Sequence, residues 1–194
     1  MTRPVAVAIT GGIGAGKSEA LAAFRRHGAA TVSSDEIVHE LLRTPEVKQA
    51  VVARLGQGIV APDGELDRAA IATIVFNDPE ALTWLEALLH PLVSAEYLRW
   101  REQLGALEHA PAVCVTEVPL LYESGGEVRF DKVVVITAAE DVRRSRSEVA
   151  TADREQWLLP DGEKAARADY VFANDGSLDE LDAFVRSVMD DLTG

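Results

Sequence analysis

The sequence predicts a three-layer α/β fold, in which a parallel sheet of about five strands lies between helices. Its short apolar runs are continuous rather than alternating, which is typical of strands buried on both faces. Segments with helical periodicity separate these runs, and a strand–helix–strand order implies parallel pairing. The strands are expected at residues 5–9, 29–33, 112–115, 132–137 and, with a weaker pattern, 169–173.

The first 33 residues predict one strand–loop–helix–strand unit. The apolar run Val5–Ile9 stops at glycines, and the next segment, 18–26, has helix-forming residues with arginines in its last turn. Gly28 is expected to end this helix, and residues 29–33 then read as the second strand.

Residues 35–110 predict a helical insert between two parts of a core, 1–34 and 111–194. Only one strong turn signal, Ala61-Pro62-Asp63-Gly64, interrupts the helical pattern. Apolar residues at helical spacing form three stripes: Ile37, Leu41 and Leu42; Val47, Val51 and Leu55; and Ala81, Leu82, Leu85, Leu88 and Leu89.

The remaining helices are expected in the second part of the core. A basic helical segment at about 140–165 predicts a small lid, that is, a segment that closes over bound phosphates. Residues 178–192 predict a surface-packed terminal helix, with apolar residues at Leu181, Phe184, Val185, Val188 and Met189.

The charge and the single cysteine exclude several classes of protein. With 19 Lys and Arg against 32 Asp and Glu, the net charge is −13, which argues against sequence-independent binding to nucleic acid or anionic membranes. Cys114 lies in an apolar run and is expected to be a buried small hydrophobe. No apolar run approaches the roughly 18 residues of a membrane span. We therefore expect a cytoplasmic protein that binds small molecules, as a monomer or a weak homo-oligomer.

The strongest motif follows the first strand and opens the first helix. Residues 11–18 match G-x-x-x-x-G-K-[ST], in the structural context that a phosphate-binding P-loop requires. Backbone N–H groups and the helix N-terminus would hold a β-phosphate, Lys17 would reach the β- and γ-phosphates, and Ser18 would bind Mg²⁺. A glycine-rich turn without function is the alternative. The residues expected to bind ATP here are Gly12, Ile13, Gly14, Ala15, Gly16, Lys17 and Ser18.

The motif predicts a P-loop NTPase fold, but GTPases, motor ATPases and small-molecule kinases all share it. A chain of 194 residues with one helical insert favours a compact kinase over a multidomain ATPase. The sequence has no Asn-Lys-x-Asp motif for guanine, which favours ATP, with Mg²⁺, as the phosphoryl donor.

Seven segments, in order along the chain, resemble the dephospho-coenzyme A kinase family. The phosphate loop resembles the family's T-G-G-I-G-S-G-K-S, and 85–91 and 118–125 resemble L-E-x-I-x-H-P and V-P-L-L-F-E-S-G. The others are 34–38, 64–68, 75–76 and, as one closing segment in two parts, 164–169 with 174–177. The resemblance implies ATP-dependent phosphorylation of the ribose 3′-hydroxyl of dephospho-coenzyme A, the last step of coenzyme A synthesis.

The resemblance also implies roles for individual residues. Asp35 would orient or deprotonate the acceptor hydroxyl, although a helix N-cap is its plain alternative. Lys17, Asp35 and Arg146 would be the catalytic residues. The acceptor would contact Asp35, His39, Arg68, His90, Glu117 and Leu120, and Asn174 and Gly176 would contact ATP. Otherwise, His90 is a histidine at a helix end, Arg68 a surface arginine, and 174–176 a turn.

Three departures from the family bear on these roles. His39 stands where the family has arginine, and Glu117 where it has aspartate. The lid is several residues short, so that Arg146 and Arg154 match the family's first and last arginines while Ala150 falls on the second. The cluster Arg143, Arg144 and Arg146 either compensates through a shifted register or is a solvated helix face. Two alternative functions follow: a degenerate homologue that binds nucleotide or coenzyme A, and a kinase for another small hydroxyl compound.

Overall fold

The computed structural model describes residues 3–146 and 158–194. Within it the chain forms two compact units, one made of Met1–Ser34 and Arg101–Gly194 and the other of Asp35–Trp100. Ala150 and Arg154, and with them the middle of the predicted lid, lie outside the described residues.

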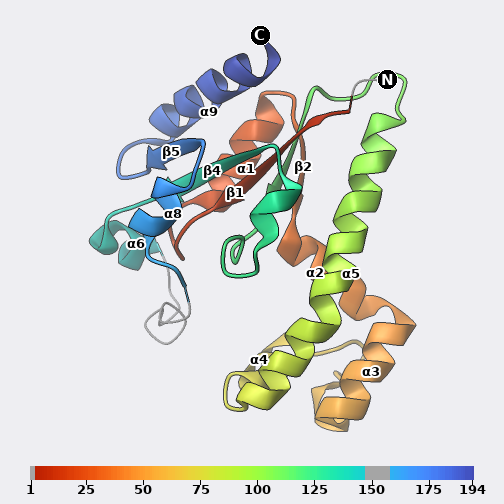
Figure 1. Cartoon of the computed structure of the whole chain (residues 1–194). Helices are drawn as coiled ribbons and strands as arrows, with labels where there is room; N and C mark the ends of the chain where they lie inside the picture. Colours follow the sequence, from red (N-terminus) through yellow and green to blue (C-terminus); the bar gives the residue numbers. More distant parts are fainter. Residues whose placement is uncertain (1–2, 147–157) are drawn as a thin grey trace. The chain divides into compact units, whose positions relative to one another are not determined.

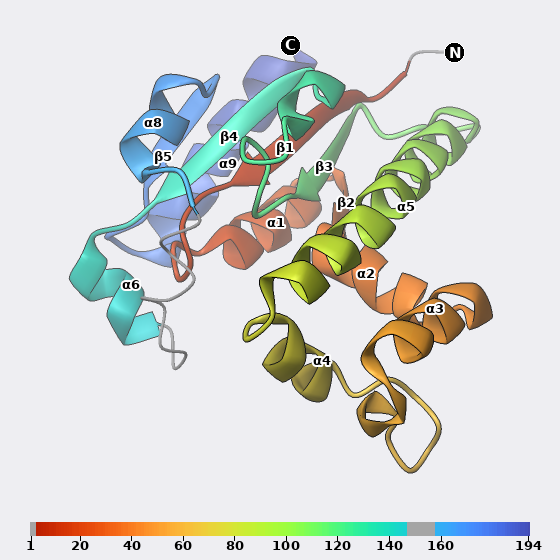
Figure 2. The same cartoon turned by 60° about the horizontal axis from the view of Figure 1, so that its bottom comes forward.

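The first unit is built on a five-stranded sheet with the order β2-β3-β1-β4-β5, and every neighbouring pair is parallel (labelled in Figure 2; Figure 1 shows the whole chain). This confirms the predicted sheet. Ala6–Ile9 of the central strand are fully buried, as their continuous apolar pattern predicts. The strands are β1 (Val5–Thr10), β2 (Ala30–Ser33), β3 (Val113–Glu117), β4 (Lys132–Thr137) and β5 (Tyr170–Ala173).

One face of this sheet is covered by α1 (Lys17–Arg26) and α9 (Leu178–Thr193), which both views show on the same side (Figures 1 and 2). Phe24 of α1 and Val185 of α9 are fully buried in this layer. Burial of each such side chain stabilises the folded protein by about 1.5–3 kcal/mol. This packing holds α1, the helix that follows the phosphate loop, against the sheet.

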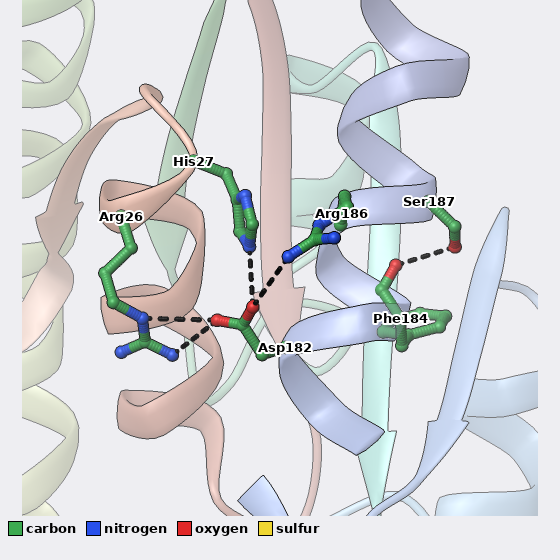
Figure 3. A network of polar contacts seen from close by, with 6 residues as sticks. All are labelled: Arg26, His27, Asp182, Phe184, Arg186 and Ser187. Atoms are coloured by element: carbon green, nitrogen blue, oxygen red, sulfur yellow. Dashed lines mark hydrogen bonds and ion pairs between the residues drawn. The ribbon is translucent and has the colours of Figure 1, made fainter. Parts of the chain in front are cut away.

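Polar contacts at the edge of this layer join the end of α1 to α9. Asp182 accepts hydrogen bonds from Arg26 (2.8 Å from Nη2) and pairs with the ring of His27 at 2.9 Å, and Arg186 lies 3.9 Å away (Figure 3). The hydrogen bonds from Arg26 and His27 lower the pKa of Asp182 below its ordinary value. A second contact in α9 itself runs from the Ser187 hydroxyl to the carbonyl oxygen of Phe184.

The opposite face carries α8 (Asp161–Ala166) and the segment that follows β3. Leu121, Tyr122 and Val135 are buried there, and Leu159 and Ala165 pack against them. Side chains at alternate positions of β4 point to the two faces, which explains why its apolar run is continuous.

Cys114 is buried in β3, as predicted, with 1% of its surface exposed. Burial raises the pKa of its thiol to about 11. The side chain is therefore an unreactive part of the core.

The second unit is helical, and the helices are α2 (Ser34–Arg43), α3 (Pro45–Leu55), η1 (Gln57–Ile59), α4 (Arg68–Val75) and the first part of α5 (Pro79–Gly105). The predicted turn is present, since the N–H of Gly64 donates to the carbonyl of Ala61 at 2.8 Å. None of the helices in the described ranges is long and apolar enough to cross a membrane.

Two of the plain alternatives, a helix N-cap at Asp35 and a helix end at His90, are contradicted by the structure. The helix α2 begins at Ser34, so Asp35 lies in its first turn and is not the residue that caps it. His90 does not lie at a helix end, because α5 continues through Pro91 to Gly105. A proline removes one backbone hydrogen bond, and here the helix continues on both sides of it. The last turn of α5 belongs to the first unit, where Arg101 pairs with Asp131 at 2.8 Å.

Candidate active site

Glycines of the loop between β1 and α1 adopt positive φ angles, which other residues rarely adopt. Gly14 and Gly16 have φ angles of 75° and 96°, a region that costs an L-residue about 1–2 kcal/mol. A Cβ on Gly11 would lie 1.9 Å from the carbonyl oxygen of Ile136 in β4. The loop is thus packed against the end of a neighbouring strand, and α1 begins directly after Gly16.

Lys17 is the first residue of α1 and is half-buried. Its Nζ atom donates a hydrogen bond of 2.9 Å to the carbonyl oxygen of Gly12. The ammonium group therefore lies over the loop, where an anion held by the loop's N–H groups would meet it.

Ser18 and Glu117 come together from α1 and from the end of β3. The Ser18 hydroxyl donates to Oε2 of Glu117 at 3.4 Å, and Glu117 is buried, with 8% exposed. Parallel pairing places Glu117 beside Ile9 of β1, at the edge of the sheet where the phosphate loop starts. A hydroxyl and a carboxylate are the kind of oxygen ligands that Mg²⁺ takes from a protein beside phosphates, so these residues fit that ion. No cluster of three or more His, Cys, Asp or Glu residues that could hold a metal occurs in residues 3–146 and 158–194.

Asn174 lies on the other side of the phosphate loop, just after β5. It is buried, its Nδ2 donates to the carbonyl oxygen of Ala15 at 2.9 Å, and its N–H donates to Thr137 at 2.8 Å. Gly176 has a structural reason to be glycine, because a Cβ there would lie 1.8 Å from Oε2 of Glu180 in the capping box of α9. The loop after β5 thus braces the phosphate loop.

Two of the clustered arginines lie at the phosphate loop and one does not. Nη1 of Arg146 donates to the carbonyl oxygen of Asn174 at 2.9 Å. Arg143 is nearer the start of the loop: a Cβ on Gly12 would lie 2.8 Å from its Nη1, and one on Gly14 would lie 2.7 Å from its carbonyl oxygen. Arg144 is exposed and pairs with Glu140 in the same helix, α6 (Glu140–Arg146).

Asp161 is a residue at this loop that the sequence analysis missed. Both of its carboxylate oxygens would lie 3.2 Å from a Cβ on Gly12, beside Arg143. Nothing in the local sequence signals this position, because it depends on how α8 packs on the sheet.

The other candidates belong to the second unit, apart from the half-buried Leu120 after β3. Arg68 donates from Nη1 to Nδ1 of His39 at 3.2 Å, so the two predicted acceptor residues lie together. Asp35 and His90 are exposed on α2 and α5.

The fold and the loop define the class of protein: an α/β phosphotransferase of the P-loop kinase type. The chain also belongs to the dephospho-CoA kinase family, whose model matches residues 5–180.

Relatives and solved structures agree with this assignment. The dephospho-CoA kinase of Symbiobacterium thermophilum is 41% identical over 93% of this chain and 78% of its own length. That of Streptomyces avermitilis is 40% identical over 96% of this chain and 93% of its own. The structure of the Campylobacter jejuni dephospho-CoA kinase is 25% identical and has a TM-score of 0.71 over 97% of this chain and 96% of its own. A shikimate kinase from Bacteroides thetaiotaomicron, 16% identical with a TM-score of 0.52 over 97% of this chain and 98% of its own, shares the fold.

Proposed function

We propose that this kinase transfers the γ-phosphoryl group of ATP to the ribose 3′-hydroxyl of dephospho-coenzyme A, which gives coenzyme A and ADP. The observation that carries the proposal is the ordered phosphate loop, with Lys17 over it and Ser18 beside Glu117, in a chain of the dephospho-CoA kinase family.

The first unit binds ATP in this proposal. Backbone N–H groups of residues 12–18 hold the β- and γ-phosphates, and Lys17 adds a positive charge. Asn174 and Gly176 lie on the adenine side, where the contact of Asn174 with Ala15 links the base-binding loop to the phosphate loop.

Ser18 holds the Mg²⁺ ion that accompanies ATP, and Glu117 binds one of its waters or orients the acceptor. When bound, the ion neutralises charge on the β- and γ-phosphates. The hydrogen bond between the two side chains supports this assignment, because it brings their oxygen atoms to within 3.4 Å of each other.

The second unit binds the acceptor. Asp35 accepts the proton of the attacking hydroxyl or orients that hydroxyl in line with the γ-phosphorus. The guanidinium of Arg68, which His39 contacts, binds the anionic part of the acceptor, and His90 and Leu120 add further contacts. Arg146 neutralises charge on the transferring phosphoryl group.

We expect the enzyme to act in the cytoplasm on these two small molecules, as a monomer or a weak homo-oligomer. The buried, unreactive thiol of Cys114 is compatible with a reducing compartment.

The substitution Asp35→Asn tests the proposal. It should abolish phosphoryl transfer to dephospho-coenzyme A while it leaves the dissociation constant of ATP, measured by calorimetry, nearly unchanged. A panel of acceptors separates the alternatives. Turnover with a nucleoside but not with dephospho-coenzyme A would favour another kinase, and binding of both ligands without turnover would favour the degenerate homologue. A near-normal kcat of Asp35→Asn would show that Asp35 has neither proposed role.

A further inference from the structure

A buried ion pair in the first unit has no role in the reaction described so far. Lys164 of α8 is fully buried, and its Nζ lies 2.8 Å from Oε1 of Glu123, in the segment after β3. The same oxygen accepts a hydrogen bond of 2.9 Å from the N–H of Leu159. The pair therefore ties α8, and the chain leading into it, to the segment that follows Glu117.

Packing alone does not require such a pair. A lysine and a glutamate removed from water lose hydration energy, and apolar side chains of similar size at such positions are often neutral or stabilising. Burial raises the pKa of Glu123, but the hydrogen bonds from Lys164 and Leu159 outweigh it, so the pKa is lowered overall and Glu123 stays charged. The pair is thus an ionic contact in a place where apolar contacts also exist.

The helix that this pair holds reaches the phosphate loop at its other end. Asp161, one turn before Lys164, lies against Gly12, next to the guanidinium of Arg143. Side chains three residues apart on a helix lie on nearly the same face, so a rotation or slide of α8 that displaced Lys164 would also displace Asp161. A Cβ on Gly12 would lie 2.8 Å from Nη1 of Arg143 and 3.2 Å from both carboxylate oxygens of Asp161, so two opposite charges flank this glycine.

We propose that Glu123 and Lys164 are positioning residues for phosphoryl transfer, which hold α8 so that Asp161 keeps the Arg143 guanidinium at Gly12 of the phosphate loop. In this proposal Arg143 contacts the transferring phosphoryl group from the Gly12 side of the phosphate loop. Arg146 contacts it from the side where Asn174 lies. The inference rests on the proposed function and extends it to residues that do not touch the acceptor.

The first test replaces Lys164 by Met, which keeps an unbranched side chain one atom shorter and removes the charge. The expected result is a kcat that falls about tenfold or more at saturating substrates, since a misplacement of about 1 Å can cost up to 100-fold. The KM for dephospho-coenzyme A should stay within about twofold of the wild type, because Asp161 of α8 lies at the phosphate loop and the proposed effect is on phosphoryl transfer.

The substitution Asp161→Asn provides a second test if the Lys164 variant folds poorly. Asp161 is half-buried at the start of α8, so its loss should leave the melting temperature unchanged while it lowers kcat in the same way. Val188→Ala serves as the control for stability, because Val188 is buried in α9 on the other face of the sheet. It should lower the melting temperature with kcat and KM unchanged.

Calorimetric titration with ATP separates this inference from the proposed function. If the wild type does not phosphorylate dephospho-coenzyme A, the proposed function fails. The positioning role still predicts that ATP binds several-fold more weakly to Lys164→Met, because Arg143 has moved. If Lys164→Met lowers only the melting temperature, or if Asp161→Asn has wild-type kinetics and ATP affinity, the inference is wrong and the pair is structural only.

Discussion

The substitution Gly16→Ala tests how closely the phosphate loop is fitted to its surroundings. Gly16 has a φ angle of 96°, and a Cβ built on it would lie 2.2 Å from Nδ2 of Asn174. The new methyl group therefore destabilises the protein in two ways. The backbone must stay in a region that alanine rarely adopts, and the Asn174 side chain must move away from Ala15.

These costs can be separated with a second glycine. Gly28, after α1, has a similar φ angle of 91°, but nothing lies within 4 Å of a Cβ built on it. Gly28→Ala should therefore destabilise the protein by the conformational cost alone, about 1–2 kcal/mol. Gly16→Ala should lose in addition the buried hydrogen bond from Asn174 to Ala15, about 1–3 kcal/mol, for a total of about 2–5 kcal/mol.

Urea unfolding of the wild type and of both variants gives the loss of unfolding free energy in each variant, and calorimetry measures the affinity for ATP. Gly16→Ala should weaken ATP binding as well as stability, whereas Gly28→Ala should leave ATP binding unchanged. Equal losses of stability in the two variants would refute the reasoning, because they would show that Asn174 does not hold the loop.

Further predictions concern single side chains. Lys17→Met should lower kcat about 100-fold, as the loss of one preorganised charge at a transition state does, in a steady-state assay. Glu117→Gln should raise the Mg²⁺ concentration needed for half-maximal activity, and an unchanged Mg²⁺ dependence would remove Glu117 from the ion's surroundings. At about pH 8 the thiol of Cys114, with its raised pKa, should resist iodoacetamide in the native protein and react after denaturation, as mass spectrometry would show. Asp182→Asn should lower the melting temperature near neutral pH. Because the pKa of Asp182 is lowered in the folded state, this difference should shrink as the pH falls below the ordinary value of 3.8 and the wild-type carboxylate takes up a proton.

Most of the sheet and its helices could be predicted because their signals are local. The run 132–137 is a strand at the predicted residues. A short apolar run between polar residues is typical of a strand buried on both faces. The helix after the phosphate loop and the terminal helix were also located to within about one or two residues. The start of α2 and the passage of α5 through Pro91 were missed, because tertiary contacts decide where a helix begins and whether it continues past a proline.

The candidate site could be predicted only in part. The phosphate loop is contiguous in sequence, so its residues were found together. The contacts of Asn174 with Ala15 and of Ser18 with Glu117 depend on strand order, which sequence spacing does not encode. The position of Asp161 against Gly12 follows from the packing of α8 and left no local signal.

ADP release from Mg-ATP, measured with and without dephospho-coenzyme A and combined with mass spectrometry of the acceptor, tests the proposed phosphoryl transfer most directly. We expect ADP formation that depends on dephospho-coenzyme A, and a product that carries one additional phosphoryl group on the ribose 3′-oxygen. ADP release at the same rate without the acceptor, or an acceptor recovered unchanged, would contradict it.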